Sequence, residues 1–199
     1  MSFATFTRLA LALYICVLQV AAAPTAEAAP ELQITSVGAI GTGCPPGTTS
    51  ARVNKDDSVS LFFSQFRADA GPSYDLSDGR TNCRLTLGVN IPAGYQFAFD
   101  QSNLNAYYHV ESKVKATAES YYYFQGQLTE GTCATSITGP STGQTTLVNK
   151  YSPLVWSPCG SAGVVNINNA LLIDNGATKS VGSIAVRNST EASFVWRRC

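Results

Sequence analysis

The sequence predicts an all-β protein, folded as a single-domain β-sandwich or jelly roll stapled by two disulfide bonds. Apolar and polar residues alternate in many short stretches, which is the period of a half-buried strand. Turn-forming Gly, Pro, Asn and Asp residues separate these stretches at regular intervals. Hydrophobic residues make up 45% of the 199 residues and charged residues 13%. The chain can therefore bury a core, and it lacks the high charge of a disordered protein.

The N-terminus has the pattern of a secretory signal. Arg8 precedes a mostly apolar run over residues 9–20, and small residues follow it. This run is shorter than the roughly 20 residues that a membrane span needs. We therefore expect a signal peptide over residues 1–22, a flexible leader over residues 23–31 and one β-sandwich domain over residues 32–199. The protein should be secreted to the extracellular space.

Strand patterns follow one another through this domain. Residues 83–91 alternate without interruption, and residues 95–100 do so directly after a Pro-Ala-Gly turn signal. Further strands are expected over residues 32–37, 58–66, 120–126, 164–173, 180–186 and 192–197. Together with weaker segments they give roughly nine or ten short strands, which suits a sandwich or a jelly roll.

Three segments carry more specific predictions. Residues 120–126 hold aromatic residues on both faces, which predicts a strand covered on both sides. Residues 110–120 fit a helix and a strand equally well. The Asp-Asn-Gly run at residues 174–176 lies between two apolar runs, which is a strong signal for a β-hairpin.

Five cysteines lie outside the expected signal peptide, and none belongs to a CxxC or Cys/His cluster, so no zinc site is expected. In an oxidising compartment we expect two disulfides and one unpaired thiol. Five choices of the unpaired cysteine, each with three pairings of the rest, leave fifteen arrangements that spacing does not separate. We favour Cys44–Cys83 with Cys159–Cys199, which divide the chain into two halves. Cys133 is then a free or an intermolecular thiol.

Most templates for catalysis are absent from the sequence. His109 is the one histidine, which excludes a metal site of two or three histidines, and we expect it to be structural. Neighbouring carboxylates occur at Asp56 and Asp57 and at Asp75 and Asp78. Their turn contexts favour hydrogen bonds to nearby backbone amides over glycoside hydrolysis or calcium binding. We therefore predict no catalytic residue, metal or cofactor, although a lyase that uses Tyr and Arg would leave no spacing signature.

Aromatic residues are the best indication of a ligand. Secreted β-sandwiches bind glycans by presenting Trp or Tyr faces to sugar rings, with amide groups alongside. The candidates are Trp156, Tyr107, Tyr108 and Tyr121, and core packing is the alternative for each. The balance of 13 basic and 13 acidic residues gives no electrostatic footprint for nucleic acid or an anionic membrane. Asn188 opens an N-glycosylation sequon, where we expect a glycan if the source is eukaryotic.

Six short motifs occur in order along the chain. They are Gly43-Cys-Pro-Pro-Gly47, Thr81-Asn-Cys-Arg-Leu85, Tyr122-Tyr-Phe-Gln-Gly126, Trp156-Ser-Pro-Cys-Gly160, Asn166-Ile-Asn168 and Trp196-Arg-Arg-Cys199. Together they resemble the secreted, mostly fungal family catalogued as domain of unknown function 4360. The resemblance implies secretion and a small β-rich fold, and its cysteine pattern supports the favoured pairing, with Cys133 as a departure. It supplies no catalytic residues.

Three functions are consistent with these observations. The leading one is a non-enzymatic extracellular protein, an effector or elicitor acting on a receptor at the host surface or in the apoplast; this applies an analogy with small, disulfide-stapled fungal proteins. The second is a cell-wall polysaccharide-binding module or carbohydrate-active enzyme with an aromatic-lined groove. The third is a structural cell-wall protein, and a cross-link through Cys133 would favour this function. We expect either a monomer or a dimer linked through Cys133. The expected partner is thus a host surface receptor or a wall glycan.

Overall fold

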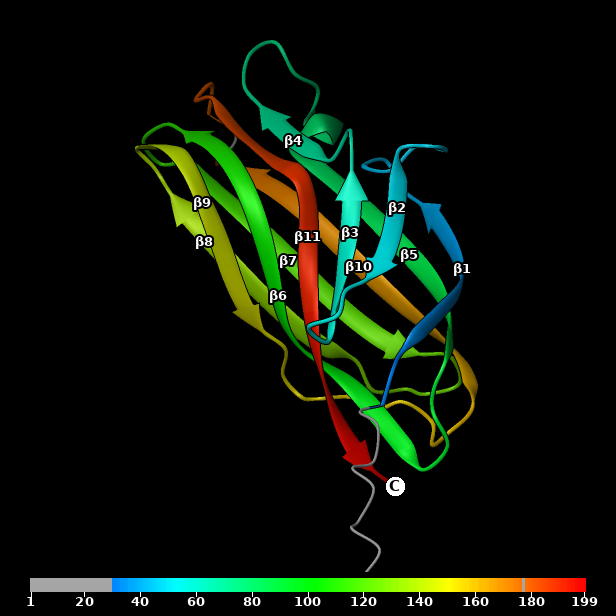
Figure 1. Cartoon of the computed structure of the whole chain (residues 1–199). Helices are drawn as coiled ribbons and strands as arrows, with labels where there is room; N and C mark the ends of the chain where they lie inside the picture. The colour runs from blue at the N-terminus through cyan, green and yellow to red at the C-terminus, as the bar shows by residue number, and fades with distance from the viewer. Residues whose placement is uncertain (1–29, 177) are drawn as a thin grey trace, which may run out of the picture.

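The computed structural model describes residues 30–176 and 178–199, without the side chains of residues 187 and 188. The expected signal peptide over residues 1–22, and all but the end of the leader over residues 23–31, lie outside the described residues. Two antiparallel β-sheets pack face to face (Figure 1), which confirms the all-β sandwich. Within the described residues, no helix has the length and apolar character needed to cross a bilayer.

Sheet A has five strands, in the spatial order β1, β5, β10, β7 and β8. Their bounds are β1 Gln33–Ile40, β5 Arg80–Asn90, β10 Ala162–Asp174, β7 Lys115–Phe124 and β8 Gly131–Thr138. The antiparallel register places Asn168 of β10 between Arg84 of β5 and Tyr121 of β7. Rows of side chains therefore run across the sheet from strand to strand.

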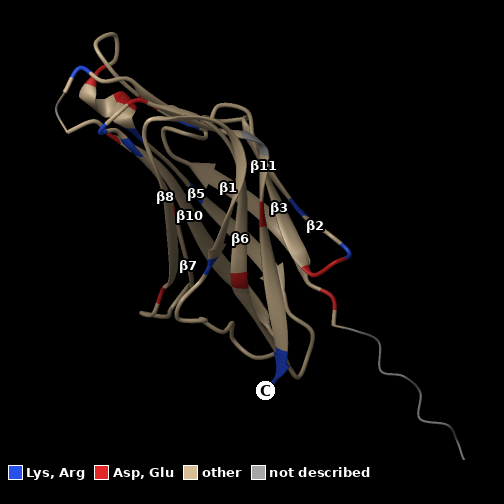
Figure 2. Ribbon diagram, turned by 90° about the vertical axis from the view of Figure 1, so that its left-hand side faces the viewer, with Lys and Arg blue, Asp and Glu red and all other residues tan. Residues whose placement is uncertain are grey.

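Sheet B has six strands and faces the viewer in Figure 1. Five of them follow the order β2 Thr49–Val53, β3 Ser58–Phe63, β11 Gly182–Arg198, β6 Tyr95–Val110 and β9 Ser141–Lys150. The sixth, β4 Arg67–Ala70, pairs with the first residues of β11, and a short 3-10 helix, η1 Leu76–Gly79, leads from it to β5. Figure 2 shows charged residues gathered most densely at the end of the sandwich that holds η1, which leaves much of both sheets uncharged.

Inward-facing residues of both sheets form the core. Five aromatic rings meet at its centre: Phe97, Phe99, Phe124, Phe194 and Tyr122. The rings of Phe99 and Tyr122 meet edge to face with centroids 5.2 Å apart, a favourable aromatic geometry. The Tyr122 hydroxyl lies 3.0 Å from the Phe99 carbonyl and accepts the backbone N–H of Val155 at 2.9 Å. This buried hydroxyl holds the connection between β9 and β10 against the core.

Strand β7 is covered on one face only. Tyr122 is fully buried between the sheets, whereas Tyr121 and Tyr123 lie half-buried on the outer face of sheet A. The prediction of a strand covered on both sides was therefore wrong. Tyrosine combines an apolar ring with a polar hydroxyl, so it can occupy a strand face that remains in contact with water.

Two disulfides, Cys44–Cys83 and Cys159–Cys199, join segments that are 39 and 40 residues apart. This confirms the favoured pairing. Cys44 and Cys83 are buried, and their bond links the connection between β1 and β2 to β5. Cys159 and Cys199 are exposed, and their bond links the connection between β9 and β10 to the residue that follows β11.

The predicted hairpin at residues 174–176 was also wrong. Strand β10 ends at Asp174 in sheet A, while β11 pairs with β3, β4 and β6 in sheet B. The local turn does form, because Asp174 Oδ1 accepts the backbone N–H of Gly176 at 2.9 Å. The chain then crosses to the other sheet. Residues 110–120, which fitted a helix or a strand, form the end of β6, a turn and the first part of β7.

Candidate functional site

The outer face of sheet B carries three neighbouring hollows. The first, of about 790 Å³, lies over β2 and β3 and reaches Tyr107 of β6. The second, of about 560 Å³, is lined by Arg67, Gln144, His109 and again Tyr107. The third, of about 570 Å³, begins at His109 and extends to the connection between β8 and β9. Neighbouring hollows share Tyr107 or His109 in their linings, so the three lie side by side, and we call them together the sheet-B groove.

Tyr107 lies at the centre of this groove. Alternate residues of a strand share a face, so Tyr107 and His109 both project outward from β6. The register places Tyr107 between Ala185 of β11 and Gln144 of β9. Tyr107 is 36% exposed.

Apolar surface makes up much of the lining, and hydroxyl and amide groups form its polar part. These polar groups come from β2, β9 and β11 and from the connections at the end of the sandwich. These side chains are Thr48, Ser50, Ser64, Thr142, Gln144, Ser180 and Ser183. Each can donate and accept hydrogen bonds without carrying a charge.

Among the described residues, the two charged side chains that line the groove, Arg67 and Glu111, have partners. Arg67 Nε donates to Asp69 Oδ2 at 2.6 Å, and the Arg67 Nη2 group also contacts Asp69 Oδ1. The hydrogen bond to Asp69 raises the pKa of Arg67. Glu111 accepts the backbone N–H of Val181 at 2.7 Å. The described lining thus presents apolar surface and neutral polar groups to a ligand.

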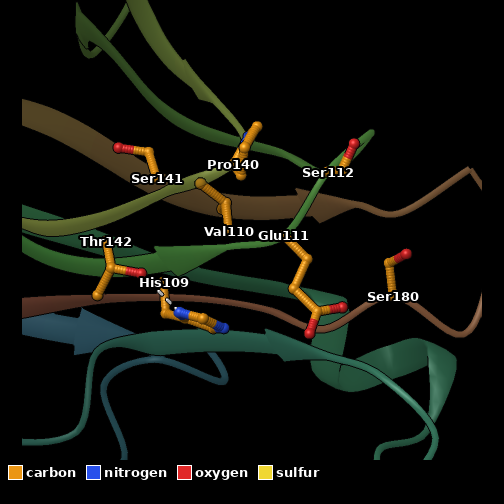
Figure 3. A pocket seen from close by; sticks show the side chains of 8 residues that line it. All are labelled: His109, Val110, Glu111, Ser112, Pro140, Ser141, Thr142 and Ser180. Atoms are coloured by element: carbon orange, nitrogen blue, oxygen red, sulfur yellow. Dashed lines mark hydrogen bonds between the residues drawn. The ribbon is translucent and has the colours of Figure 1, made fainter.

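His109 and Glu111 lie close together at one end of the groove (Figure 3). His109 Nδ1 and Thr142 Oγ1 are hydrogen-bonded at 2.7 Å. Glu111 is the one carboxylate among the described residues that line the groove, and most glycoside hydrolases need a pair. In the part of the chain that the structure describes, no three His, Cys, Asp or Glu side chains are grouped to hold a metal ion.

The four aromatic candidates lie in three separate places. Tyr107 and Tyr108 both line the second hollow, and Tyr108 also packs against the edge of the core. Tyr121 lies on the outer face of sheet A, on the opposite side of the sandwich. Trp156 lies in the connection between β9 and β10, where the guanidinium carbon of Arg197 sits 4.1 Å from its ring centroid. Arg197 therefore occupies one face of the Trp156 ring.

The four candidate carboxylates lie outside the groove lining, in turns. Asp78 Oδ2 accepts the backbone N–H of Asp75 at 2.9 Å, as part of a capping box at the start of η1. Asp56 Oδ1 accepts the hydroxyl of Ser58 at 2.7 Å, and Asp57 Oδ1 accepts Trp196 Nε1–H at 3.3 Å. These contacts give each carboxylate a local structural role.

Cys133 of β8 lies opposite Ser120 of β7 and is half-buried, with no disulfide partner among the described residues. Burial raises the pKa of its thiol to about 11, although a hydrogen bond with Tyr151 opposes this shift. The thiol is therefore protonated at neutral pH, and its role as a free or intermolecular thiol stays a prediction. Asn188 belongs to β11, and its side chain lies outside the described residues.

Sequence reasoning identified Tyr107 but missed the groove residues around it. Phe62, Arg67 and Gln144 lie on β3, β4 and β9, which are far apart in the chain. Sheet topology alone brings them beside Tyr107, so no short motif marks them. The one local signal was Arg67 with Asp69, two residues apart on one strand face, where an ion pair can form.

Two solved structures show weak similarity to this chain. One is TmCBM61 in complex with β-1,4-galactotriose, at 12% identity and a TM-score of 0.28, covering 85% of this chain and 88% of that one. The other is a family 11 carbohydrate-binding module from Clostridium thermocellum in complex with a β-1,3-1,4-mixed-linked tetrasaccharide, at 8% identity and a TM-score of 0.24, covering 84% and 97%. Similarity at this level supports no conclusion about the ligand of this chain.

A closer relative comes from the fungus Arthroderma benhamiae and is described as an uncharacterized secreted protein. It is 31% identical over 178 residues, which span 85% of this chain and 72% of the relative. The protein is accordingly a secreted one, as its N-terminal pattern led us to expect. The resemblance drawn from the six motifs is confirmed, since the family model matches residues 30–199. The chain belongs to the family described as Domain of unknown function (DUF4360).

Proposed function

We propose that the protein is a non-catalytic extracellular module that binds a neutral polysaccharide along the sheet-B groove. One observation carries this proposal: three hollows lie side by side around Tyr107 and His109, and their described lining residues include few charged side chains. Each hollow falls within the range of about 300–1,000 Å³ that holds a small-molecule ligand. Three in series suit several consecutive units of a polymer better than one compact molecule.

The chemistry of the lining matches that of a sugar chain. Sugar rings have apolar C–H faces that pack against aromatic side chains, and Tyr107, which is 36% exposed, is an aromatic residue in the lining of two hollows. Sugar hydroxyls both donate and accept hydrogen bonds, as do Gln144, Ser183 and Thr142 beside it. Arg67 and Glu111 are already engaged by Asp69 and Val181, so the groove offers little to favour a charged polymer over a neutral one.

Binding is tested by titrating the protein with soluble neutral glucan and xylan oligosaccharides in a calorimeter. Tyr107→Ala should weaken binding by at least about tenfold, because it removes the central aromatic surface. Tyr107→Phe should retain most of the affinity, since the ring remains. Leu128→Ala is the matched control, because Leu128 is a fully exposed apolar residue in the connection between β7 and β8. It should bind like the wild type.

Two results would contradict the proposal. Either no neutral oligosaccharide binds to the wild type, or Tyr107→Ala binds as tightly as the wild type does. A parallel assay for new reducing ends tests the non-catalytic part. Release of sugar ends would instead support a carbohydrate-active enzyme and would make Glu111 the first residue to substitute.

The other interpretations stay predictions. An effector or elicitor role needs a host receptor, and no contact among the described residues favours one. A structural role in the cell wall, with a dimer linked through Cys133, is likewise favoured by no contact among the described residues. Infiltration of leaves with intact and with reduced protein would test the effector role directly, because a response to the folded shape should disappear when the disulfides are opened.

A further inference from the structure

The outer face of sheet A, opposite the groove, carries a second set of aromatic and polar side chains. They belong to two neighbouring rows that cross the central strands β5, β10 and β7. We call these six residues the sheet-A platform: Arg84, Asn168 and Tyr121 in one row, and Thr86, Asn166 and Tyr123 in the other.

Two tyrosines form one side of this platform. Tyr121 and Tyr123 are two residues apart on β7, so they project from the same face about 7 Å apart along the strand. Both are half-buried, while Tyr122 between them points into the core. Two rings at this spacing offer an extended apolar surface at the middle of a polar sheet face.

Asn168 lies between Arg84 and Tyr121 in the first row. Arg84 Nη2 donates to the Tyr121 hydroxyl at 3.3 Å, and the two side chains meet from the strands on either side of Asn168. Only 8% of Asn168 is exposed, in keeping with its place between these two long side chains. The exposed part of the first row is therefore Arg84 and Tyr121, and Asn168 fills the space between them.

The second row repeats the arrangement. Thr86 Oγ1 donates to Asn166 Oδ1 at 2.8 Å, which orients the Asn166 amide so that its nitrogen remains available as a donor. Asn166 lies directly beside Tyr123. Each tyrosine of the platform therefore has an amide side chain next to it, an arrangement suited to a sugar ring and its hydroxyl groups.

The platform and the groove differ in the partner of their arginine side chain. Arg67 in the groove is paired with Asp69, and this is the one ion pair in the described part of the chain. Arg84 is bonded instead to the neutral hydroxyl of Tyr121. Glu119 projects from the same face two residues from Tyr121, and Glu130 adds a smaller attraction for Arg84. Neither carboxylate bonds to Arg84, so four of its five N–H donors remain free for a carboxylate ligand.

We propose that the sheet-A platform binds an acidic oligosaccharide, with Arg84 holding a uronate carboxylate, Tyr121 and Tyr123 contacting the sugar rings, and Asn166 bonding to a hydroxyl. This site is distinct from the sheet-B groove and has a different ligand class. One molecule then carries a neutral-glycan surface and an acidic-glycan surface on opposite faces. The proposal does not rest on the function proposed for the groove.

Calorimetry with soluble oligogalacturonates, and with the same oligomers fully methyl-esterified, tests the platform. The wild type should bind the acid form at least about tenfold more tightly than the ester, and this preference should shrink as salt is added. Arg84→Gln should abolish the preference for the acid form. Tyr123→Ala should weaken binding of both forms, because the ring contacts carry no charge.

Arg80→Gln is the matched control. Arg80 is exposed on the same face of β5, four residues or about 13 Å from Arg84, and its substitution removes the same charge. It should change binding by less than about twofold, and Tyr107→Ala should bind oligogalacturonate like the wild type. The proposal is overturned if acid and ester bind equally, if neither binds, or if Arg80→Gln weakens binding as much as Arg84→Gln. Loss of acid binding in Tyr107→Ala would move the site to the groove, and it too would overturn the platform.

Discussion

Tyr107 and Tyr108 are adjacent in the chain and face opposite environments. Both carry the same side chain, so composition does not separate them. The alternation of side chains along β6 distinguishes them, because residues that alternate with the buried Leu104, Ala106 and Val110 point outward. Tyr107 therefore lines the groove and Tyr108 packs against the core edge. Sequence reasoning nominated both residues, and only the strand phase shows which of them a ligand can reach.

Buried acids should make the protein sensitive to high pH. Burial raises the pKa of Cys133 from 9.0 to about 11 and that of Tyr122 from 10.0 to about 12, and it also raises the pKa of Tyr151. The unfolded chain loses these protons first. The stability that these groups contribute is therefore fully present below about pH 9, and it is lost as the pH rises toward about 12. Urea unfolding midpoints measured from pH 7 to pH 11 should fall above about pH 9.

A Cys133→Ala variant separates the thiol from the tyrosines. Its unfolding midpoint should begin to fall nearer pH 10.0, the ordinary pKa of the remaining tyrosines, rather than near pH 9.0. Comparison at pH 7 gives the cost of the lost side chain alone. A midpoint that stays constant up to pH 11 in the wild type would show that these groups titrate alike in the folded and unfolded chains.

At the scale of elements, edge strands explain most of what sequence patterns missed. Strands β5 and β10 lie at the centre of sheet A, and their alternating apolar residues were predicted. Strands β8 and β9 each lie at one edge of their sheet, and their Thr, Ser and Gly residues gave no apolar alternation. An edge strand buries less surface, so its sequence needs less apolar character. The turn at residues 174–176 was recognisable, but which sheet the next strand joins depends on long-range packing.

The two disulfides should differ in their susceptibility to reduction. Their loops are 39 and 40 residues, so the chain-entropy model gives each about 4 kcal/mol of stabilisation. Access differs: Cys44 and Cys83 are buried, whereas Cys159 and Cys199 are exposed. A mild thiol reductant acting on the folded protein should open Cys159–Cys199 first. Alkylation followed by mass spectrometry will identify the thiols released.

Reduction of the urea-unfolded protein is the control for this difference in reduction rate. In unfolded protein both bonds are accessible, so they should be reduced at similar rates. The account is contradicted if Cys44–Cys83 opens as quickly as Cys159–Cys199 in the folded protein, since that would mean that the core admits the reductant without unfolding.

At the scale of the whole molecule, the sandwich has two outer faces with different chemistry. In the sheet-B groove Arg67 is paired with Asp69, whereas on the sheet-A platform Arg84 bonds to the neutral hydroxyl of Tyr121. The core between them fixes these faces on opposite sides, because the same strands bury one set of residues and expose the other. Sequence analysis predicted this layered fold and named Tyr107 and Tyr121. Which face each of them joins, and with which neighbours, follows from strand order.

The claim that the groove binds a neutral polysaccharide is tested most directly by locating a bound oligosaccharide with NMR. Isotope-labelled protein is titrated with the neutral oligosaccharide that binds best, and the backbone amide shifts are followed residue by residue. We predict that the largest changes cluster at Tyr107, His109, Gln144 and Ser183, with the amides of β7 and β10 unchanged. Changes centred on Trp156 or on the sheet-A platform, or no saturable change at all, would contradict the account.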